Sequence, residues 1–226
     1  MCGRYTLRMT GKEIADELGL SEEPVVEARY NLAPTQAAPI VLDQHPTVLT
    51  TARWGLIPHW AKEASIASRM INARAETLAS NHAFHEALSH RRCLVVADGF
   101  YEWKRSGKQK QPMHLSLSSH QLATFAGLWD TWRAPNGLEL LTFTIVTTRA
   151  NPQVAPIHDR MPAFLSRPAR AQWLDPVTPE GGLLELLQPW SGEPLQIYPV
   201  SSLVGSVAID DPRCVEPAQQ IQLELL

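Results

Sequence analysis

Short runs of β-branched and aromatic residues, bounded by proline, glycine or asparagine, recur along the chain and constrain its fold more than any other feature. Eighteen prolines among the 226 residues punctuate these runs, so the elements are expected to be short. We predict eight strands, at residues 38–42, 47–54, 93–97, 100–104, 113–117, 123–128, 140–147 and 195–200.

Four segments are predicted to be helical: 10–18, 81–90, 167–174 and 183–188. The first carries clear end signals, because Thr10 and Glu13 form a T-x-x-E capping box and Gly19 stands where a C-cap is expected. Strands outnumber helices and do not alternate with them, which favours an α+β fold over a doubly wound one. We expect a single domain, 1–226, with a mainly antiparallel, barrel-like core and a few flanking helices.

Several classes of protein are excluded by what the chain lacks. No run approaches 18 apolar residues, so no transmembrane helix is expected. The first twenty residues hold no apolar segment of the kind found in signal peptides. Three cysteines, an odd number, argue against a disulfide framework and for a reducing compartment. We therefore expect a soluble cytoplasmic protein.

The formal net charge of -3 gives by itself no sign of a nucleic-acid partner. The charge is unevenly spread, however. Residues 53–110 hold ten basic and five acidic residues, a local +5, whereas residues 111–226 hold six basic and eleven acidic ones, a local -5. Two solvated faces of unlike sign explain this pattern. A basic surface that meets phosphate groups explains it equally, because phosphates respond to the local field.

Cys2 stands at the start of the chain, followed by Gly3 and outside any predicted core strand. If Met1 is removed, Cys2 becomes a 1,2-aminothiol, with an amine of pKa about 7.7–8 and a thiol of pKa about 8.5 when unperturbed. The amine can attack an aldehyde to give an imine, and the thiol can then close a five-membered thiazolidine ring. The same thiol can serve as the nucleophile in amide hydrolysis. The residues alone leave both chemistries open, beside that of an ordinary terminal cysteine.

Three polar segments hold further candidates. In the first, Asn72, Arg74 and Glu76 alternate, so they would share one face of an extended segment. Glu102 follows a Phe-Tyr pair and precedes Trp, and apolar surroundings raise the pKa of a carboxyl group. His158 lies in a loop between two prolines and is a natural proton shuttle. Each segment also has a purely structural explanation: an edge strand, a surface glutamate or a rigid polar loop.

The remaining cysteines and histidines give weaker indications. Cys93 lies in an apolar run and is expected in the core, whereas Cys214 has no evident partner and is expected to be incidental. His82 and His85 lack the cysteine or carboxylate neighbours of a zinc site, so we predict no metal. The aromatic residues around Trp60 lie near basic ones, an arrangement that can stack single-stranded bases but also occurs in ordinary cores.

Six short motifs, beginning at the second residue, occur together in the order of a known family. They are Cys2-Gly3-Arg4-Tyr5, Tyr30-Asn31-Leu32-Ala33-Pro34-Thr35, Trp54-Gly55-Leu56-Ile57-Pro58, Ile71-Asn72-Ala73-Arg74-Ala75-Glu76-Thr77, Asp98-Gly99-Phe100-Tyr101-Glu102-Trp103 and Ile157-His158-Asp159-Arg160-Met161-Pro162. Over about residues 2–205 the chain resembles the SRAP family, the SOS-response-associated peptidases, also described as abasic-site processing proteins. Each motif alone is weak, and the series is specific.

The resemblance implies the SRAP fold and a protein that binds single-stranded DNA and crosslinks to an abasic site. Cys2 would form a thiazolidine with the ring-opened sugar and so shield the lesion. Asn72 would hydrogen-bond the sugar or the reacting amine, and Glu102 would position and deprotonate that amine. His158 would protonate the ring oxygen and then assist ring closure. In the family, removal of Met1 is attributed to an autoproteolytic activity.

The resemblance also implies DNA contacts at Arg4, Pro34, Trp60, Arg74, Thr147 and Arg160. The three arginines would hold flanking phosphates through charge-assisted hydrogen bonds. Some members carry two adjacent tryptophans as a wedge against the bases, whereas here only one follows the G-x-x-P loop. No cofactor, metal or membrane partner is implied. We expect a cytoplasmic monomer that associates with the nucleoid when bound to DNA.

Two other functions stay open. A thiol peptidase or amidase with an N-terminal Cys or a Cys–His pair would cleave amide substrates repeatedly, whereas a crosslinking protein reacts once or reverses slowly. A passive single-strand-binding module would keep its DNA affinity and its biological role after Cys2→Ser.

Overall fold

The computed structural model describes residues 2–218; residues 1 and 219–226 lie outside that description. The strands are β1 (Tyr5–Leu7), β2 (Arg29–Leu32), β3 (Ala37–Leu42), β4 (Leu49–Trp54), β5 (Asn72–Arg74), β6 (Arg92–Ala97), β7 (Gly99–Ser106), β8 (Gln109–Leu117), β9 (Ala123–Arg133), β10 (Glu139–Arg149), β11 (Arg160–Pro162) and β12 (Leu195–Pro199). The helices are α1 (Gly11–Leu18), α2 (His85–His90), α3 (Arg167–Leu174) and α4 (Glu180–Glu185), with 3₁₀ turns η1 (Ala64–Arg69), η2 (Ala75–Thr77), η3 (Ser202–Gly205) and η4 (Pro212–Cys214).

The larger sheet closes on itself. Its strand order is β11-β10-β4-β3-β6-β9, and a further pairing of β9 with β10 joins β10, β4, β3, β6 and β9 into a five-stranded barrel. β10 runs parallel to β4 and β5, and its other neighbours, like the remaining pairs of this sheet, are antiparallel. The predicted α+β fold with a mainly antiparallel, barrel-like core is confirmed.

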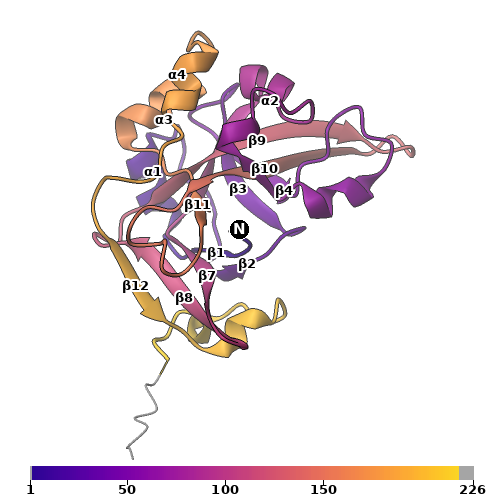
Figure 1. The fold of residues 1–226 in the computed structure, drawn as a ribbon. Helices are drawn as coiled ribbons and strands as arrows, with labels where there is room; N and C mark the ends of the chain where they lie inside the picture. The colour runs from indigo at the N-terminus through magenta and orange to yellow at the C-terminus, as the bar shows by residue number, and fades with distance from the viewer. Residues whose placement is uncertain (1, 219–226) are drawn as a thin grey trace, which may run out of the picture.

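The second sheet is antiparallel throughout, in the order β12-β8-β7-β1-β2. Figure 1 shows it in the lower half of the molecule, with α2, α3 and α4 above it. A single residue, Asp98, connects β6 of the barrel to β7 of this sheet. Asp98 accepts hydrogen bonds from the Thr6 hydroxyl and from the Arg8 backbone, which fixes β1 against β7. Gly99 is required here, because a Cβ would lie 2.5 Å from the His114 ring.

Two of the predicted helices are confirmed closely and two begin elsewhere. α1 has the predicted capping box of Thr10 and Glu13, and Gly19 closes it in the left-handed conformation. α3 matches its predicted span. The helix predicted for 81–90 begins only at residue 85, because Asn81 holds the preceding residues in a turn through its side chain and carbonyl. The prediction of 183–188 was also wrong in its bounds, since α4 starts directly after Pro179.

One large apolar cluster takes residues from both sheets, and Cys93 lies in it as predicted. A second, smaller cluster is formed by Tyr101, Val200, Val204 and Cys214. The expectation that Cys214 is incidental was therefore wrong, because this last residue of η4 is buried in a cluster with Tyr101 of β7 and Val200, which follows β12. Nothing in the local sequence signals this, since the partners of Cys214 come from β7 and from the loop after β12.

The segment after β12, which the sequence left unassigned, packs back onto β2. The Asp210 carboxylate accepts the backbone N–H groups of Tyr30 and Asn31 and pairs with Arg29. The Asn31 side chain donates in turn to carbonyls of this segment, including that of Ile209 at 2.7 Å. The segment is thus part of the folded unit as far as residue 218. Over the described residues, no helix is long and apolar enough to span a bilayer.

Candidate functional site

Cys2 lies just before β1, and its side chain is buried. Its thiol donates to the carbonyl of Arg4, and its own carbonyl accepts a hydrogen bond of 2.9 Å from the Asn72 side-chain amide. Asn72 opens β5, which is held beside β10 by parallel pairing with Ile145. A segment of the larger sheet therefore fixes the start of the chain, 70 residues away in sequence.

Glu102 comes to the same place on β7, which pairs with β1 through Tyr5 and Phe100. Its side chain is buried, and burial raises the pKa of the carboxyl group above its ordinary value, although the charge of His158 acts in the opposite direction. Burial, and secondly the charge of Glu102, also raises the pKa of the Cys2 thiol. The prediction that apolar surroundings would raise the pKa of Glu102 is confirmed.

His158 lies in the loop before β11, and with Glu102 it lines a hollow of about 300 Å³. Its Nδ1 accepts the Arg160 backbone N–H at 3.0 Å, and it also lies 2.9 Å from a carboxylate oxygen of Asp159. Both contacts are made by the same ring nitrogen, so they fix the orientation of the imidazole within the hollow.

The structure brings together all four residues predicted to act chemically, each from a different segment of the chain. The site combines a thiol at the chain start, a carboxamide, a carboxyl group with a raised pKa and an imidazole. Within the described residues, the Asn72 Oδ1 atom is buried with no hydrogen-bond partner. A buried acceptor of this kind is costly to leave unpaired, so it is suited to receive a donor from a ligand.

The three arginines predicted to hold phosphates differ in how they are engaged. Arg74 is exposed and lines a hollow of about 510 Å³ together with Asn72 and Arg69. Arg160 forms a two-pronged pair with Glu76. Arg4 donates to Asn31 and to carbonyls of η3, including Val204 at 2.6 Å, and so ties the start of the chain to its C-terminal segment.

The prediction that Asn72, Arg74 and Glu76 share one face of an extended segment is only partly correct. β5 ends at Arg74, and Glu76 lies in the 3₁₀ turn η2, where its carboxylate pairs with Arg160 from β11. The alternation of polar side chains therefore continues only as far as the strand does.

The other residues predicted to contact DNA lie on β10 and in two loops. Thr147 is buried on β10 opposite Arg74, and its hydroxyl donates to the Ala73 carbonyl. Pro34 is half-buried in the loop after β2. Trp60 is 47% exposed, and its ring stacks on His82 with centroids 5.6 Å apart. A histidine thus accompanies the single tryptophan of this loop.

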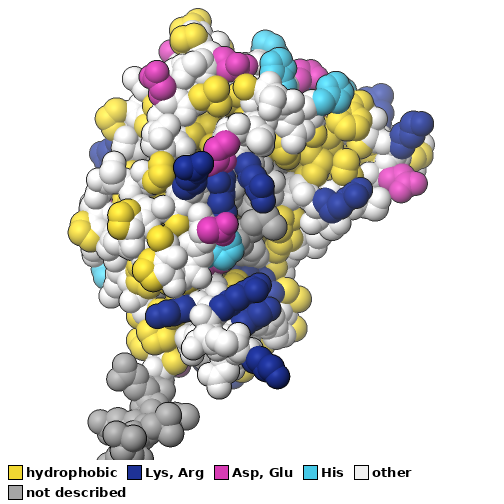
Figure 2. Space-filling model, in the orientation of Figure 1, with side chains coloured by type: hydrophobic (Ala, Val, Ile, Leu, Met, Phe, Trp, Pro, Cys, Tyr) yellow, Lys and Arg dark blue, Asp and Glu magenta, His cyan; other side chains and the backbone are white. Residues whose placement is uncertain are grey.

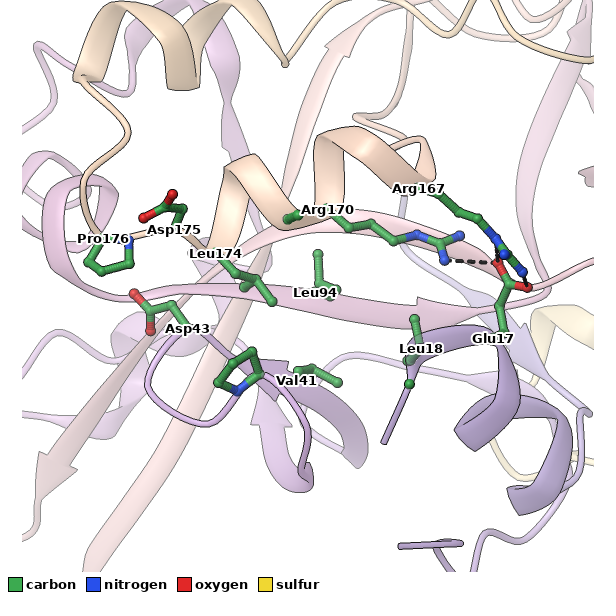
Figure 3. Close-up of a pocket in the computed structure, with 13 residues that line it drawn as sticks. Glu17, Leu18, Val41, Asp43, Leu94, Arg167, Arg170, Leu174, Asp175 and Pro176 are labelled. Carbon is green, nitrogen blue, oxygen red and sulfur yellow. Dashed lines mark hydrogen bonds and ion pairs between the residues drawn. The ribbon is translucent and has the colours of Figure 1, made fainter. Parts of the chain in front are cut away.

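A larger hollow, of about 610 Å³, lies elsewhere, between α1, α3 and strands β3 and β6 (Figure 3). Val41, Leu94 and Leu174 form an apolar part of its wall. Glu17, which also lines it, forms ion pairs with both Arg167 and Arg170. None of the predicted site residues lines it. The volume of a hollow therefore does not identify the reactive site in this protein. Among the described residues, no group of three or more His, Cys, Asp or Glu is placed to hold a metal ion.

A family model described as "SOS response associated peptidase (SRAP)" matches residues 1–207. The chain belongs to the SRAP family. This SRAP chain is 41% identical over 222 residues to the abasic site processing protein YoqW of Bacillus subtilis, across 96% of this chain and 99% of that protein. It is 32% identical over 265 residues to the abasic site processing protein HMCES of Gallus gallus, across 97% and 78%. A crystal structure of a Bacteroides thetaiotaomicron protein superposes with a TM-score of 0.88 at 25% identity, across 96% of this chain and 100% of that one.

The sequence did not single out every charged residue at the edges of this SRAP site. Arg69 lines the hollow that holds Asn72, and Arg105 and Lys110 line the hollow that holds Glu102 and His158. Arg105 and Lys110 were counted only within a basic stretch. The glycine at position 107, between the two residues, was a sign that a turn joins two strands there. Such a turn places Arg105 and Lys110 opposite each other on paired strands.

Proposed function

We propose that this protein recognises abasic sites in single-stranded DNA and captures them covalently through Cys2, as a thiazolidine crosslink. The observation that carries the proposal is the convergence of Asn72, Glu102 and His158, from three separate elements, on the buried start of the chain. The relatives named abasic site processing proteins support the substrate, since this chain matches one of them over nearly its whole length.

The chemistry requires that Met1 be removed, because only then does Cys2 carry a free α-amine. An abasic sugar opens to an aldehyde when its ring C1′–O bond breaks and the ring oxygen gains a proton. The amine adds to the aldehyde carbon, and the product loses one water to give an imine. The thiol then adds across the imine bond, its sulfur bonding to the carbon and its proton passing to nitrogen. One water leaves overall, and no oxidant or cofactor is consumed.

Each neighbouring side chain has a place in this sequence. His158 supplies the proton to the sugar ring oxygen and recovers one as the hydroxyl at C1′ becomes the aldehyde. Glu102 accepts a proton from the α-amine, because a carboxylate with a raised pKa is a stronger base. Asn72 holds the Cys2 carbonyl with its amide and offers its buried Oδ1 to the amine or to the sugar. Removal of Met1 by the protein itself is part of the proposal, and we assign that step to Cys2 and Glu102.

The alternative of a turnover thiol peptidase is less well supported. Such enzymes hold the cysteine as a thiolate, with its pKa lowered by a neighbouring histidine or helix N-terminus. Here burial and the Glu102 charge raise the pKa of Cys2, and the thiol donates to the Arg4 carbonyl. A neutral thiol suits a reaction that begins with the amine and closes with the sulfur.

The test uses single-stranded DNA carrying one abasic site, resolved on a denaturing gel. Wild-type protein should form a stable adduct, and Cys2→Ala should form none. A Cys2→Ala protein prepared without Met1 keeps the α-amine at position 2, so borohydride should trap its imine and restore a band. Cys214→Ala removes another buried thiol and serves as the matched control, with an adduct yield equal to wild type. If Cys2→Ala forms the stable adduct as well as wild type does, the proposal is wrong. Repeated cleavage of an amide substrate would support the peptidase instead.

A further inference from the structure

The hairpin of β7 and β8 carries four basic residues close to its turn: Lys104, Arg105, Lys108 and Lys110. All four are exposed, and none forms an ion pair with a described residue. Figure 2 shows Lys and Arg side chains gathered over the lower part of the molecule, below a histidine on the same face, where Figure 1 places this hairpin. The hairpin is therefore a cationic projection next to the site.

Arg105 and Lys110 are direct partners across the two antiparallel strands. Like charges placed directly opposite each other are destabilising, so the fold gains nothing from this pair. Both residues line the hollow that Glu102 and His158 also line. Two exposed cations without an ion-pair partner among the described residues, in the wall of the hollow that Glu102 and His158 also line, form a natural phosphate site.

We propose that Arg105 and Lys110 clamp a backbone phosphate of the DNA strand that flanks the lesion, on the Glu102–His158 side of Cys2. The proposal rests on the proposed function in taking single-stranded DNA as the ligand. A phosphate between the two side chains removes their mutual repulsion and holds the strand over the hollow.

The part of the site around Asn72 offers the other half of a strand path. There Arg69 and Arg74 line a second hollow, and Asn72 lies in its wall. Asn72 is bonded to Cys2, whereas Glu102 belongs to the first hollow. A strand that runs from one hollow to the other therefore passes Cys2 at the middle, with cations available to phosphates on both sides.

The test measures binding of unmodified single-stranded DNA, so that no crosslink forms, as a function of salt. The variant is the double Arg105→Gln, Lys110→Gln. The matched control is Lys12→Gln with Arg133→Gln, which removes the same charge from exposed positions on α1 and β9. Loss of the clamped phosphate should make the slope of log affinity against log salt shallower by about 0.7 and weaken binding about fivefold near 0.1 M salt. The control should match wild type in both.

If the salt slope of the hairpin variant equals that of wild type, the clamp is wrong, whether or not the affinity falls. The clamp is also wrong if the control variant shows the same change in slope as the hairpin variant. Thermal unfolding checks the fold, and the hairpin variant should be at least as stable as wild type because a repulsive pair has been removed.

The crosslinking reaction separates this proposal from the previous one. The concentration of abasic DNA that gives half of the final adduct should rise in the hairpin variant and stay at the wild-type value in the control. A wild-type protein that shows the salt effect but never crosslinks would keep the clamp and refute the thiazolidine chemistry.

Discussion

Glu102 is buried beside Cys2, and burial raises the pKa of its carboxyl group above the ordinary 4.5. The folded protein therefore retains a proton that the unfolded chain releases, so the free energy of unfolding falls as the pH rises from about 4.5 through the raised pKa. We predict that Glu102→Gln raises the melting temperature at pH 7, by about 2–4 °C for each kcal/mol recovered. The gain should vanish near pH 4, and crosslinking should slow at every pH.

Glu76 provides a matched comparison of opposite sign. Its hydrogen bonds with Arg160 lower the pKa of the Glu76 carboxyl group, so it stabilises the fold above its unfolded pKa and loses this effect as the pH falls. We predict that Glu76→Gln lowers the melting temperature at pH 7 by a small amount, since the pair is partly exposed, and that this difference shrinks as the pH falls below about 4.5. Melting curves across this range check both variants. A Glu102→Gln protein that is less stable than wild type at pH 7 would contradict the account of burial.

The residues of the site were predictable to different degrees. The apolar neighbours of Glu102 in the sequence were enough to predict its raised pKa. The partners of the arginines were not predictable, because Arg160 pairs with Glu76 and Arg4 reaches the Val204 carbonyl, 84 and 200 residues away. A basic residue in a motif can therefore indicate a phosphate contact in sequence and still have intramolecular partners in the fold.

At the scale of elements, the segment after β12 is held to β2 chiefly through Asp210. Its carboxylate satisfies two backbone N–H groups that would otherwise lack a partner, those of Tyr30 and Asn31. We predict that Asp210→Ala costs about 2–4 kcal/mol of stability, because unsatisfied backbone donors cost about 1–3 kcal/mol each. Denaturant unfolding measures the cost. Glu216→Ala, at an exposed position of the same segment, should stay within about 0.5 kcal/mol of wild type. Equal effects of the two substitutions would contradict this role of Asp210.

The elements also show which local signals suffice. The eight predicted strands are present because each is a run of apolar or β-branched residues long enough to be recognised. β1, β5 and β11 have three residues each and β2 has four, and long-range pairing creates them. β5 and β11 form because each pairs with β10, one along each edge of that strand. These short strands carry or adjoin Cys2, Asn72 and His158, so the fold at the site was the part least visible in the sequence.

At the scale of the whole molecule, charge was informative only after the fold was known. The count of +5 over residues 53–110 includes Arg92, which is buried and donates to backbone carbonyls, and Arg91, which pairs with Glu86. Four exposed cations of that stretch instead line two hollows beside the site: Arg69, Arg74, Arg105 and Lys110. A net charge of -3 is thus compatible with a local cationic surface.

The two sheets share one core, which predicts how the whole chain unfolds. Phe100 of the second sheet packs against Phe125 of the barrel, with ring centroids 6.1 Å apart, and both belong to the same apolar cluster. We predict a single calorimetric transition with equal calorimetric and van't Hoff enthalpies. The enthalpy should be about 160 kcal/mol near 60 °C for a chain of this length. Phe100→Leu should lower that one midpoint without splitting the peak. An earlier, separate transition of the second sheet would show that the chain holds two units, and Cys2 would then lie at their boundary.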